Sequence, residues 1–162
     1  MNITVREVTT DHVPVLTEII KKSFHNVAKK FNLTKENAPK HPSNCQEDWI
    51  YSALEKGVKY YLLEFEDTPI GCVALEFANT EICYLERLAV LPSFRAKGYG
   101  TILVKYLINK AIEAKQRRIE IGIIANDVKL RKWYEKLDFH IKNKAKFNHL
   151  PFEVIFMFLD LD

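Results

Sequence analysis

One stretch constrains the fold more than any other: an apolar strand that leads through a short turn into a long amphipathic helix. Residues Cys83–Leu91 have strand character, and Pro92 ends the run. The turn Arg95-Ala96-Lys97-Gly98-Tyr99-Gly100 then opens a helix expected over Tyr99–Lys115. Its apolar side chains recur at helical spacing and form one stripe: Tyr99, Ile102, Leu103, Tyr106, Leu107, Ala111 and Ala114. The sequence therefore predicts a strand–turn–helix unit in which one face of the helix is apolar.

The start of this helix has the chemistry of an anion-binding site. The first N–H groups of a helix lack intrahelical partners, and the helix dipole places partial positive charge there. Gly98 and Gly100 allow close approach of the backbone to a ligand and dihedrals that a Cβ would forbid. Arg95 and Lys97 add positive charge beside these donors. The turn therefore predicts a ligand that carries a phosphate or a pyrophosphate.

Strand and helix patterns continue on both sides of this unit, without repeats or low-complexity linkers. Strands are expected at Ile3–Val8, Tyr60–Phe65, Ile70–Phe77, Ile119–Ile124, Phe139–Lys146 and Val154–Leu159. Further helices are expected at Val13–Phe24, Gln46–Lys56 and Lys129–Leu137, with Asp11 as the N-cap of the first. Phe31–Cys45 is irregular and predicts a loop or lid, and Glu66-Asp67-Thr68-Pro69 predicts a hairpin turn. The strand–helix–strand order of the second half implies a crossover and a locally parallel pair of strands.

Composition excludes several classes of protein. The chain has 162 residues, 48% of them hydrophobic, which is enough for one globular α/β domain over residues 1–162. Its 24 basic and 21 acidic residues are interspersed, so no nucleic-acid partner is expected. No stretch approaches the roughly 20 apolar residues of a membrane span, and Met1–Arg6 lacks a signal-peptide core. The cysteines are odd in number and lack metal-ligand spacing, which favours a reduced, cytoplasmic protein without a metal site: Cys45, Cys72 and Cys83.

Three motifs together resemble the GNAT superfamily of acetyl-CoA-dependent N-acetyltransferases. They are Leu88-Ala89-Val90-Leu91-Pro92, Arg95-x-x-Gly98-x-Gly100 and Trp133-Tyr134-Glu-Lys-Leu-Asp-Phe139. The resemblance implies a mixed, mostly antiparallel sheet of about seven strands flanked by about four helices. It also implies that the fourth and fifth strands are parallel and splay apart around the pantetheine arm. The implied activity is transfer of an acetyl group from acetyl-CoA to a primary amine, by direct attack in a ternary complex.

The same resemblance implies which residues hold acetyl-CoA. The amides of Lys97–Thr101 would wrap the pyrophosphate, and backbone groups of Leu88–Val90 would hold the pantetheine and the thioester carbonyl. The family usually has Asn seven residues before the helix tyrosine, where this chain has Asp127 with Asn126 beside it, so both remain candidates. The full set of expected contacts is Leu88, Ala89, Val90, Arg95, Ala96, Lys97, Gly98, Tyr99, Gly100, Thr101, Asn126, Asp127 and Tyr134. Asp138 stands where the family usually has Gly; Asp tolerates the left-handed region that such a helix stop needs.

Two residues are candidates for the proton transfers of the reaction. Glu86 lies within an otherwise apolar strand, where desolvation would raise the pKa of its carboxyl and suit it as the base. Two alternatives stay open: Glu86 as a rim carboxylate paired with a Lys or Arg, and a water chain as the base. Tyr134 is the candidate acid that protonates the sulfur of CoA, and its alternative is an aromatic residue packed in the core.

The remaining residues of interest give weaker indications of function. An apolar-strand cysteine such as Cys83 is usually inert. His41 is expected to be a solvated loop residue, with contact to the substrate as the alternative. The remaining aromatic residues are expected to be mostly core, with a place for some of them in the acceptor pocket as the alternative: Phe24, Phe31, Trp49, Tyr51, Tyr84, Phe147 and Phe152. The acceptor amine, a small molecule or a peptide, is not specified by the sequence, nor is the acyl chain beyond acetyl. A homodimer is left open. The alternative function is a non-catalytic acyl-CoA-binding sensor or regulatory module.

Overall fold

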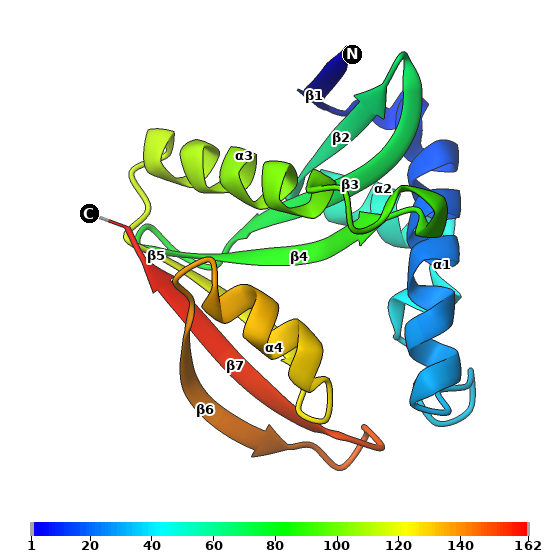
Figure 1. Cartoon of the computed structure of the whole chain (residues 1–162), viewed down its shortest axis with the longest axis vertical. Helices are drawn as coiled ribbons and strands as arrows, with labels where there is room; N and C mark the ends of the chain where they lie inside the picture. Colours follow the sequence, from blue (N-terminus) through cyan, green and yellow to red (C-terminus); the bar gives the residue numbers. More distant parts are fainter. Residues whose placement is uncertain (1, 162) are drawn as a thin grey trace.

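The computed structural model describes residues 2–161, so Met1 and Asp162 of the predicted domain lie outside the described residues. Seven strands form one sheet in the order β1-β2-β3-β4-β5-β7-β6 (Figure 1). The strands are β1 (Ile3–Glu7), β2 (Lys59–Phe65), β3 (Thr68–Phe77), β4 (Ile82–Val90), β5 (Arg118–Ile124), β6 (His140–Lys146) and β7 (Glu153–Asp160). The helices are α1 (Val13–Lys30), α2 (Glu47–Glu55), α3 (Tyr99–Glu113) and α4 (Val128–Glu135). Three short 3₁₀ turns lie at Thr10–His12, Pro42–Asn44 and Pro92–Phe94.

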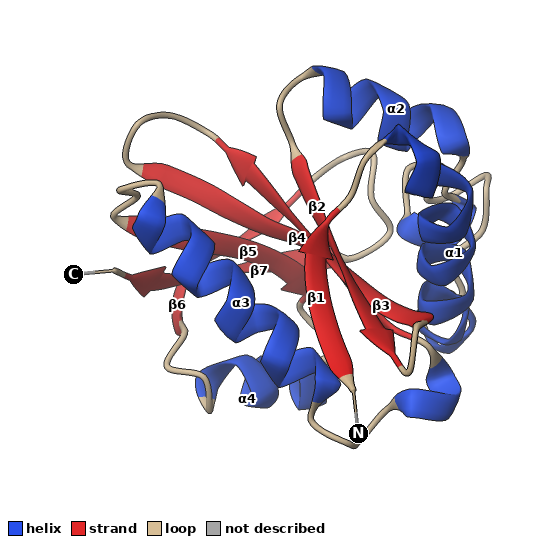
Figure 2. Ribbon diagram, turned by 90° about the horizontal axis from the view of Figure 1, so that it is seen from above, coloured by secondary structure: helices blue, strands red, loops and turns tan. Residues whose placement is uncertain are grey.

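The sheet lies between two pairs of helices, with α1 and α2 on one face and α3 and α4 on the other (Figure 2). Strand β2 is an example of a strand that is apolar at successive positions because helices cover both faces of the sheet. Tyr61 and Leu63 pack in the core under α3 and α4, whereas Tyr60 and Leu62 pack in the core under α1 and α2. Because successive residues of a strand face opposite sides, both must be apolar when both faces are covered.

The parallel strands β4 and β5 pair only at their beginnings, which opens the sheet. Their register runs from Ile82 opposite Arg118 to Tyr84 opposite Glu120, and beyond this point the strands separate. All other neighbouring strands pair antiparallel. The predicted mixed sheet with parallel, splayed fourth and fifth strands is therefore confirmed. The splay leaves the outer half of β4 without a strand partner on one side, next to the start of α3.

The first helix departs most from its prediction. It extends to Lys30 rather than ending at Phe24, and His12 rather than Asp11 is its N-cap. Asp11 instead lies in a 3₁₀ turn that precedes the helix. The extra turns are held by a small separate core that joins Ala28 to Ile124 at the end of β5. Tertiary packing of this kind extends helices beyond what local sequence supports.

The long helix α3 begins at Tyr99, as predicted, and its apolar face is rotated slightly from the expected stripe. Val104 is buried, whereas Ile102 remains 37% exposed. Ala114 lies just past the end of the helix and is exposed. The helix therefore presents to the sheet the face that is centred on Leu103 and Leu107.

Two predicted turns adopt left-handed backbone. Glu66 and Asp67 have φ values of 49° and 66°, the pattern of a two-residue hairpin turn, and β3 begins directly afterwards at Thr68. Asp138 follows α4 with φ 71°, so the aspartate does occupy the left-handed position expected of it. No helix among residues 2–161 is both long enough and apolar enough to cross a membrane.

Candidate active site

The first part of the site is the N-terminus of α3, which has no side-chain cap. Its N-cap is Gly98, and the first intrahelical bond runs from Ile102 N to Gly98 O at 3.1 Å. The amides of Tyr99, Gly100 and Thr101 therefore have no helical carbonyl to pair with. They border a cavity of about 170 Å³ whose lining is Val90, Phe94, Arg95, Ala96, Gly98, Tyr99, Gly100, Thr101 and Trp133. Free donors at the positive end of a helix dipole fit a pyrophosphate here.

The two glycines of the turn are needed for different reasons. Gly98 has φ +88°, a left-handed conformation that side chains rarely adopt. Gly100 is helical, but a Cβ there would lie 3.3 Å from the indole ring of Trp133. The second glycine thus lets α4 approach α3, and it brings Trp133 into the wall of the small cavity. The sequence analysis gave Trp133 no role in the site, because its contact with α3 leaves no local pattern.

The basic side chains of the turn are placed unequally. Arg95 donates from Nε to Val90 O at 3.0 Å and also hydrogen-bonds Ser23 O, so its guanidinium ties the turn to β4 and α1. Lys97 is exposed, with its Nζ 5.8 Å from the ring centroid of Phe94. The backbone N–H groups are therefore the most firmly positioned donors that this turn offers to an anion, and Lys97 adds mobile charge.

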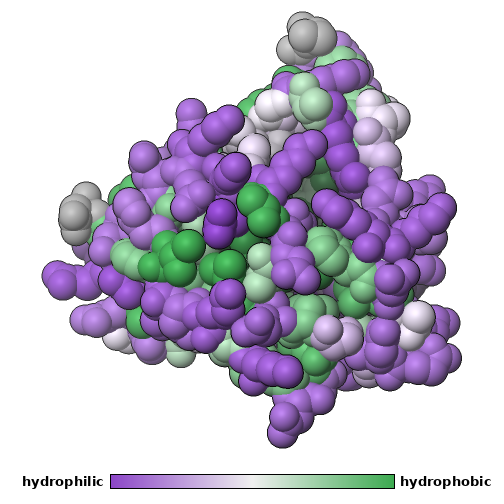
Figure 3. All heavy atoms as spheres, turned by 60° about the horizontal axis from the view of Figure 1, so that its bottom comes forward, coloured by the Kyte–Doolittle hydropathy of each residue, from purple (hydrophilic) through white to green (hydrophobic). Residues whose placement is uncertain are grey.

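A larger cavity of about 480 Å³ continues from the splay between β4 and β5. Its walls are largely apolar and come from α1, β4, β5, α4 and the loop before β7: Phe24, Val27, His41, Pro42, Leu85, Glu86, Arg87, Leu88, Ile121, Gly122, Ile123, Ile124, Asp127, Leu130, Tyr134, Phe147, Leu150, Phe152, Val154 and Phe156. Figure 3 shows the face of the molecule that lies at the bottom of Figure 1. Apolar side chains gather in the middle of this face, and hydrophilic side chains surround them. A long, mostly apolar cavity next to an anion site matches the pantetheine arm and pyrophosphate of CoA.

The predicted cofactor contacts divide between these two cavities. Leu88, Asp127 and Tyr134 line the large cavity, and Val90 lines the small one. Ala89 is buried on the opposite face of the sheet, under α1 and α2. Asn126 is exposed and lines neither cavity, whereas Asp127 is the N-cap of α4 and its Oδ1 accepts from Leu130 N at 3.2 Å. Of the two alternatives, Asp127 is the residue next to the cavity.

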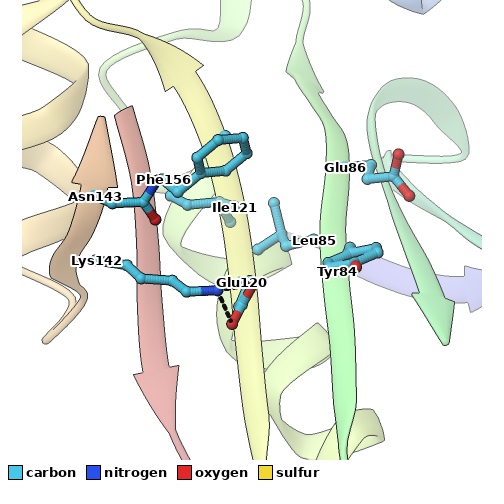
Figure 4. Close-up of a pocket in the computed structure, with 9 residues that line it drawn as sticks. Tyr84, Leu85, Glu86, Glu120, Ile121, Lys142, Asn143 and Phe156 are labelled. Carbon is cyan, nitrogen blue, oxygen red and sulfur yellow. Dashed lines mark hydrogen bonds and ion pairs between the residues drawn. The ribbon is translucent and has the colours of Figure 1, made fainter. Parts of the chain in front are cut away.

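Glu86 lies where three cavities meet. It lines the 480 Å³ cavity, a second cavity of about 390 Å³ between β4 and β6, and a third of about 130 Å³ under α2. In Figure 4 its side chain points away from β5, whereas Leu85 points towards it. Burial raises the pKa of the Glu86 carboxyl, and the Glu76 carboxyl raises it further through its charge and a side-chain hydrogen bond. Among residues 2–161 no Lys or Arg forms an ion pair with Glu86, so the paired-carboxylate alternative is not what the structure has.

Glu76 is a site residue that the sequence analysis missed. It lies on β3 opposite Tyr84, on the same face as Glu86, and both glutamates line the 130 Å³ cavity. The signal was present, because Glu76 interrupts the apolar run of β3 just as Glu86 interrupts that of β4. What the sequence does not show is the register that sets the two carboxyl groups side by side.

Tyr134 is almost fully buried, with 4% of its surface exposed, and its ring packs edge-on against Trp133 and Phe139. Burial raises the pKa of its hydroxyl, so the phenol stays protonated and can act as a hydrogen-bond donor. It is thus a core residue of α4 that also borders the large cavity. The core-aromatic alternative is therefore true of Tyr134, and its role as the acid stays a prediction that its place beside the large cavity allows.

Two expectations for other side chains are wrong. His41 is half-buried in the wall of the large cavity, edge-on to Phe24, and its Nδ1 lies 2.8 Å from Ser43 Oγ. Burial and the charge of Arg87 lower the pKa of His41 to about 4. None of the seven aromatic residues expected to be mostly core is fully buried. Five of them line cavities, which was the alternative for this set, whereas Phe31 packs against the small core at the end of α1 and Tyr51 is 40% exposed. The loop that carries His41 folds back onto α1, which local sequence does not specify.

Cys83 is fully buried, and its Sγ donates to Arg118 O at 3.6 Å. Burial raises the pKa of its thiol to about 11, so the residue is not activated as a nucleophile. In the part of the chain that the structure describes, no group of three or more His, Cys, Asp or Glu could hold a metal ion.

Comparison with known proteins agrees with this geometry. The sequence profile of the Acetyltransferase (GNAT) family matches residues 17–139. An uncharacterised N-acetyltransferase of Methanocaldococcus jannaschii is 24% identical over 149 residues, which cover 88% of this chain. The aligned region covers 63% of that relative, so this chain spans less than two thirds of its length.

Solved structures share the fold at low identity. The yncA protein of Salmonella typhimurium, solved with its cofactor acetyl-CoA, matches with a TM-score of 0.75 at 19% identity over 100% of this chain and 95% of that one. A GNAT acetyltransferase of Elizabethkingia anophelis with acetyl-CoA bound matches with a TM-score of 0.72 at 20% identity, over 99% of both chains. The ribosomal-protein-S18-alanine N-acetyltransferase of Escherichia coli reaches 0.79 at 15% identity, over 98% and 94%. Since the family profile spans most of the chain, including the turn and the tyrosine helix, this protein belongs to the Acetyltransferase (GNAT) family.

Proposed function

We propose that this protein is an N-acetyltransferase that moves an acetyl group from acetyl-CoA to a primary amine in a ternary complex. The observation that carries the proposal is the position of Glu86: a carboxyl group of raised pKa at the junction of the cavities, beside the splay of β4 and β5. The uncapped start of α3 and the apolar cavity below it support acetyl-CoA as the donor. The family membership supports the reaction class.

When bound, acetyl-CoA supplies a thioester whose carbonyl carbon a neutral amine can attack. The amine reaches the site largely as an ammonium ion, so the protein must first remove a proton. Glu86 takes that proton, directly or through water; this assignment is supported by its position in the cavity walls and by the absence of an ion pair to its carboxylate within residues 2–161. The bond between nitrogen and the acetyl carbon forms as the bond from that carbon to sulfur breaks.

The leaving thiolate gains a proton, and Tyr134 is placed to provide it. Burial keeps its hydroxyl protonated, and the residue lines the same cavity as Glu86. The backbone of β4 beyond Tyr84 has no strand partner on the β5 side, so its N–H groups there can stabilise the charge that develops on the carbonyl oxygen. No covalent intermediate with the protein is required, in line with the unreactive, buried Cys83.

The first test is calorimetric titration with acetyl-CoA, with ATP and NAD as controls. Selective binding of acetyl-CoA is expected, and Gly98→Val should weaken it because a branched side chain disfavours the left-handed conformation at φ +88°. A folded protein that binds none of the three ligands would overturn the proposal. A panel of small amines and peptides is then screened for release of free CoA thiol.

The second test separates an enzyme from an acyl-CoA-binding sensor. Tyr134→Phe should lower kcat about 10²- to 10⁴-fold, as expected for loss of a proton-transfer group, while the affinity for acetyl-CoA is retained. Tyr106→Phe, a half-buried tyrosine of α3 that packs on Tyr61, is the matched control and should leave kcat unchanged. Normal turnover in the Tyr134 variant would remove its proposed role.

A further inference from the structure

Arg87 is the one lysine or arginine in the walls of the two cavities that meet under α1 and α2, as far as residues 2–161 show. It is half-buried, and no hydrogen bond or ion pair from its guanidinium is found within these residues. Arg6 and Arg118 pair with carboxylates, and Arg95 is held by two carbonyl groups. A half-buried guanidinium that faces a cavity without such a partner is available to an anion from outside.

A β-bulge places Arg87 in this position. Ala74 pairs with Glu86 and Cys72 pairs with Ala89, so two residues of β4, Arg87 and Leu88, stand opposite Val73 alone. Arg87 takes up the extra residue with φ +52°. A positive φ is unfavourable for a residue other than glycine, and such strained residues cluster at functional sites.

The bulge changes which side chains face the cavities. In a regular strand Glu86 and Arg87 would point to opposite faces of the sheet. Here both line the 130 Å³ cavity, together with Trp49 and Tyr60 from the α2 side of the sheet. Leu88 returns to the opposite core, under α3 and α4. Consecutive residues therefore present a carboxyl group and a guanidinium to the same space.

The charged groups around the Glu86 carboxyl and the Arg87 guanidinium give the site an acidic side and a basic side. Glu76 lies on the same face beside Glu86, so this side of the site is acidic. His41 faces the large cavity from the loop above, and its lowered pKa leaves it neutral near pH 7. Asp127 caps α4 and uses one carboxylate oxygen on the backbone. Arg87 is therefore the only formal positive charge that lines this region at neutral pH, within the described chain.

The outer wall of the large cavity is apolar. It consists of side chains from α1 and from the loop between β6 and β7, with one from β7: Phe24, Val27, Phe147, Phe152 and Phe156. Such a wall fits a hydrocarbon or aromatic substituent and offers no further charge.

We propose that the acceptor is a zwitterionic amine, with an ammonium group beside Glu86 and Glu76, a carboxylate paired with Arg87, and an apolar substituent against the aromatic wall. An apolar α-amino acid has this arrangement of groups. The guanidinium would hold the carboxylate by two parallel N–H···O bonds, which orients the amine towards the splay of the sheet. This inference rests on the proposed acetyltransferase function and adds the class of its acceptor.

The experiment compares amines that differ only in the carboxylate. The pairs are L-phenylalanine with 2-phenylethylamine and L-leucine with 3-methylbutylamine, each assayed for CoA thiol release at saturating acetyl-CoA. The wild-type protein should favour the amino acid of each pair by about 10- to 100-fold in kcat/KM, the range of one charged hydrogen-bonded contact. Arg87→Met, which keeps the length of the aliphatic stem, should abolish this preference through KM of the amino acid. It should reduce kcat/KM of the plain amines far less than that of the amino acids, so the ratio within each pair is the readout.

Two further variants make the result specific. Arg87→Lys keeps the charge without the planar fork, so it should restore part of the preference. Arg117→Met removes an exposed arginine from the cavity at the other end of β5 and should leave both members of each pair unaffected. Circular dichroism and thermal melting confirm that each variant is folded.

The outcomes separate this inference from the proposed function. If the wild-type protein turns over the plain amine as well as the amino acid, or if Arg87→Met slows both members equally, the zwitterion inference is wrong. Acetylation of polyamines or peptides without any turnover of amino acids would keep the function and overturn the inference. If no amine is acetylated, calorimetry of each amino acid against the protein–CoA complex decides: Arg87-dependent binding supports the carboxylate site, and no binding overturns it.

Discussion

Glu86 and Glu120 lie on neighbouring strands and line the same 390 Å³ cavity, yet their surroundings differ (Figure 4). Glu120 is 8% exposed, and its carboxylate lies 3.1 Å from Lys142 Nζ and 3.9 Å from a guanidinium nitrogen of Arg118. Glu86 has the carboxyl group of Glu76 as a neighbour, and Arg87 acts on it through its charge but forms no ion pair with it in the described chain. The same side chain is thus paired with cations at one position, whereas at the other it is set beside a second carboxyl group that raises its pKa.

The difference arises from which strand lies beside each residue. Beyond β5 the sheet continues with β7 and β6, and β6 brings Lys142 over Glu120. Beyond β4 lies β3, whose register brings Glu76 next to Glu86. The cationic neighbour of Glu120 predicts a structural role for that residue. The carboxyl neighbour of Glu86 predicts a chemical role.

The largest expected effect is on turnover. Glu86→Gln should lower kcat about 10²- to 10⁴-fold, because the base is lost, while calorimetry shows unchanged affinity for acetyl-CoA. Glu120→Gln should retain kcat within a few-fold at a temperature where it is folded. Equal loss of activity in both variants would remove the distinction between the two carboxylates.

The second effect is on the free energy of unfolding, and here the Glu120 variant rather than the Glu86 variant should show the larger loss. Glu120→Gln should lower the free energy of unfolding by about 1–2 kcal/mol, because charged hydrogen bonds to Lys142 are lost. Glu86→Gln should be neutral or stabilising, since it removes the repulsion between two partly buried carboxyl groups. Urea unfolding at pH 7 measures both, and a greater loss in the Glu86 variant would contradict the comparison.

The third effect is on the pH profile. The pKa of Glu86 is raised by burial and by Glu76, and the base acts in its deprotonated form, so kcat/KM should rise with pH through that pKa. Glu76→Gln removes the like charge, which lowers the pKa of Glu86 and should move the acidic limb of the profile to lower pH. If the acidic limb stays in place, Glu76 does not act on the base.

The smallest effect is expected at the partner of Glu120. Lys142→Met should cost less than about 1 kcal/mol in the free energy of unfolding, because the lysine is 44% exposed and Arg118 still lies near Glu120. The acidic limb of the kcat/KM profile should not move, in contrast to Glu76→Gln. A shift of that limb would show that the two carboxylate environments are coupled.

Much of the turn before α3 could be predicted because its sequence signals are local. A proline after an apolar strand, glycines at the helix start and a 3.6-residue apolar period lie within one short segment, and α3 begins at the predicted Tyr99. The length of α1 could not be predicted in the same way, since its last turns are held by contacts with Ile124 about a hundred residues away. The positions of the aromatic residues around the large cavity also depend on contacts between distant segments. Their hydrophobicity predicts that they are shielded from solvent, but not whether they lie in the core or in the wall of a cavity.

Most elements, their order, the glycine-containing start of α3 and the candidates Glu86 and Tyr134 could be predicted from local sequence, because dihedral preferences and apolar periods act over a few residues. The neighbours of those residues follow from the packing of the whole domain. Strand register set Glu76 beside Glu86, a bulge turned Arg87 into the same cavities, and the position of β6 gave Glu120 its lysine. Burial and neighbouring charge determine the pKa of a carboxyl group, and both depend on contacts between segments that are distant along the chain.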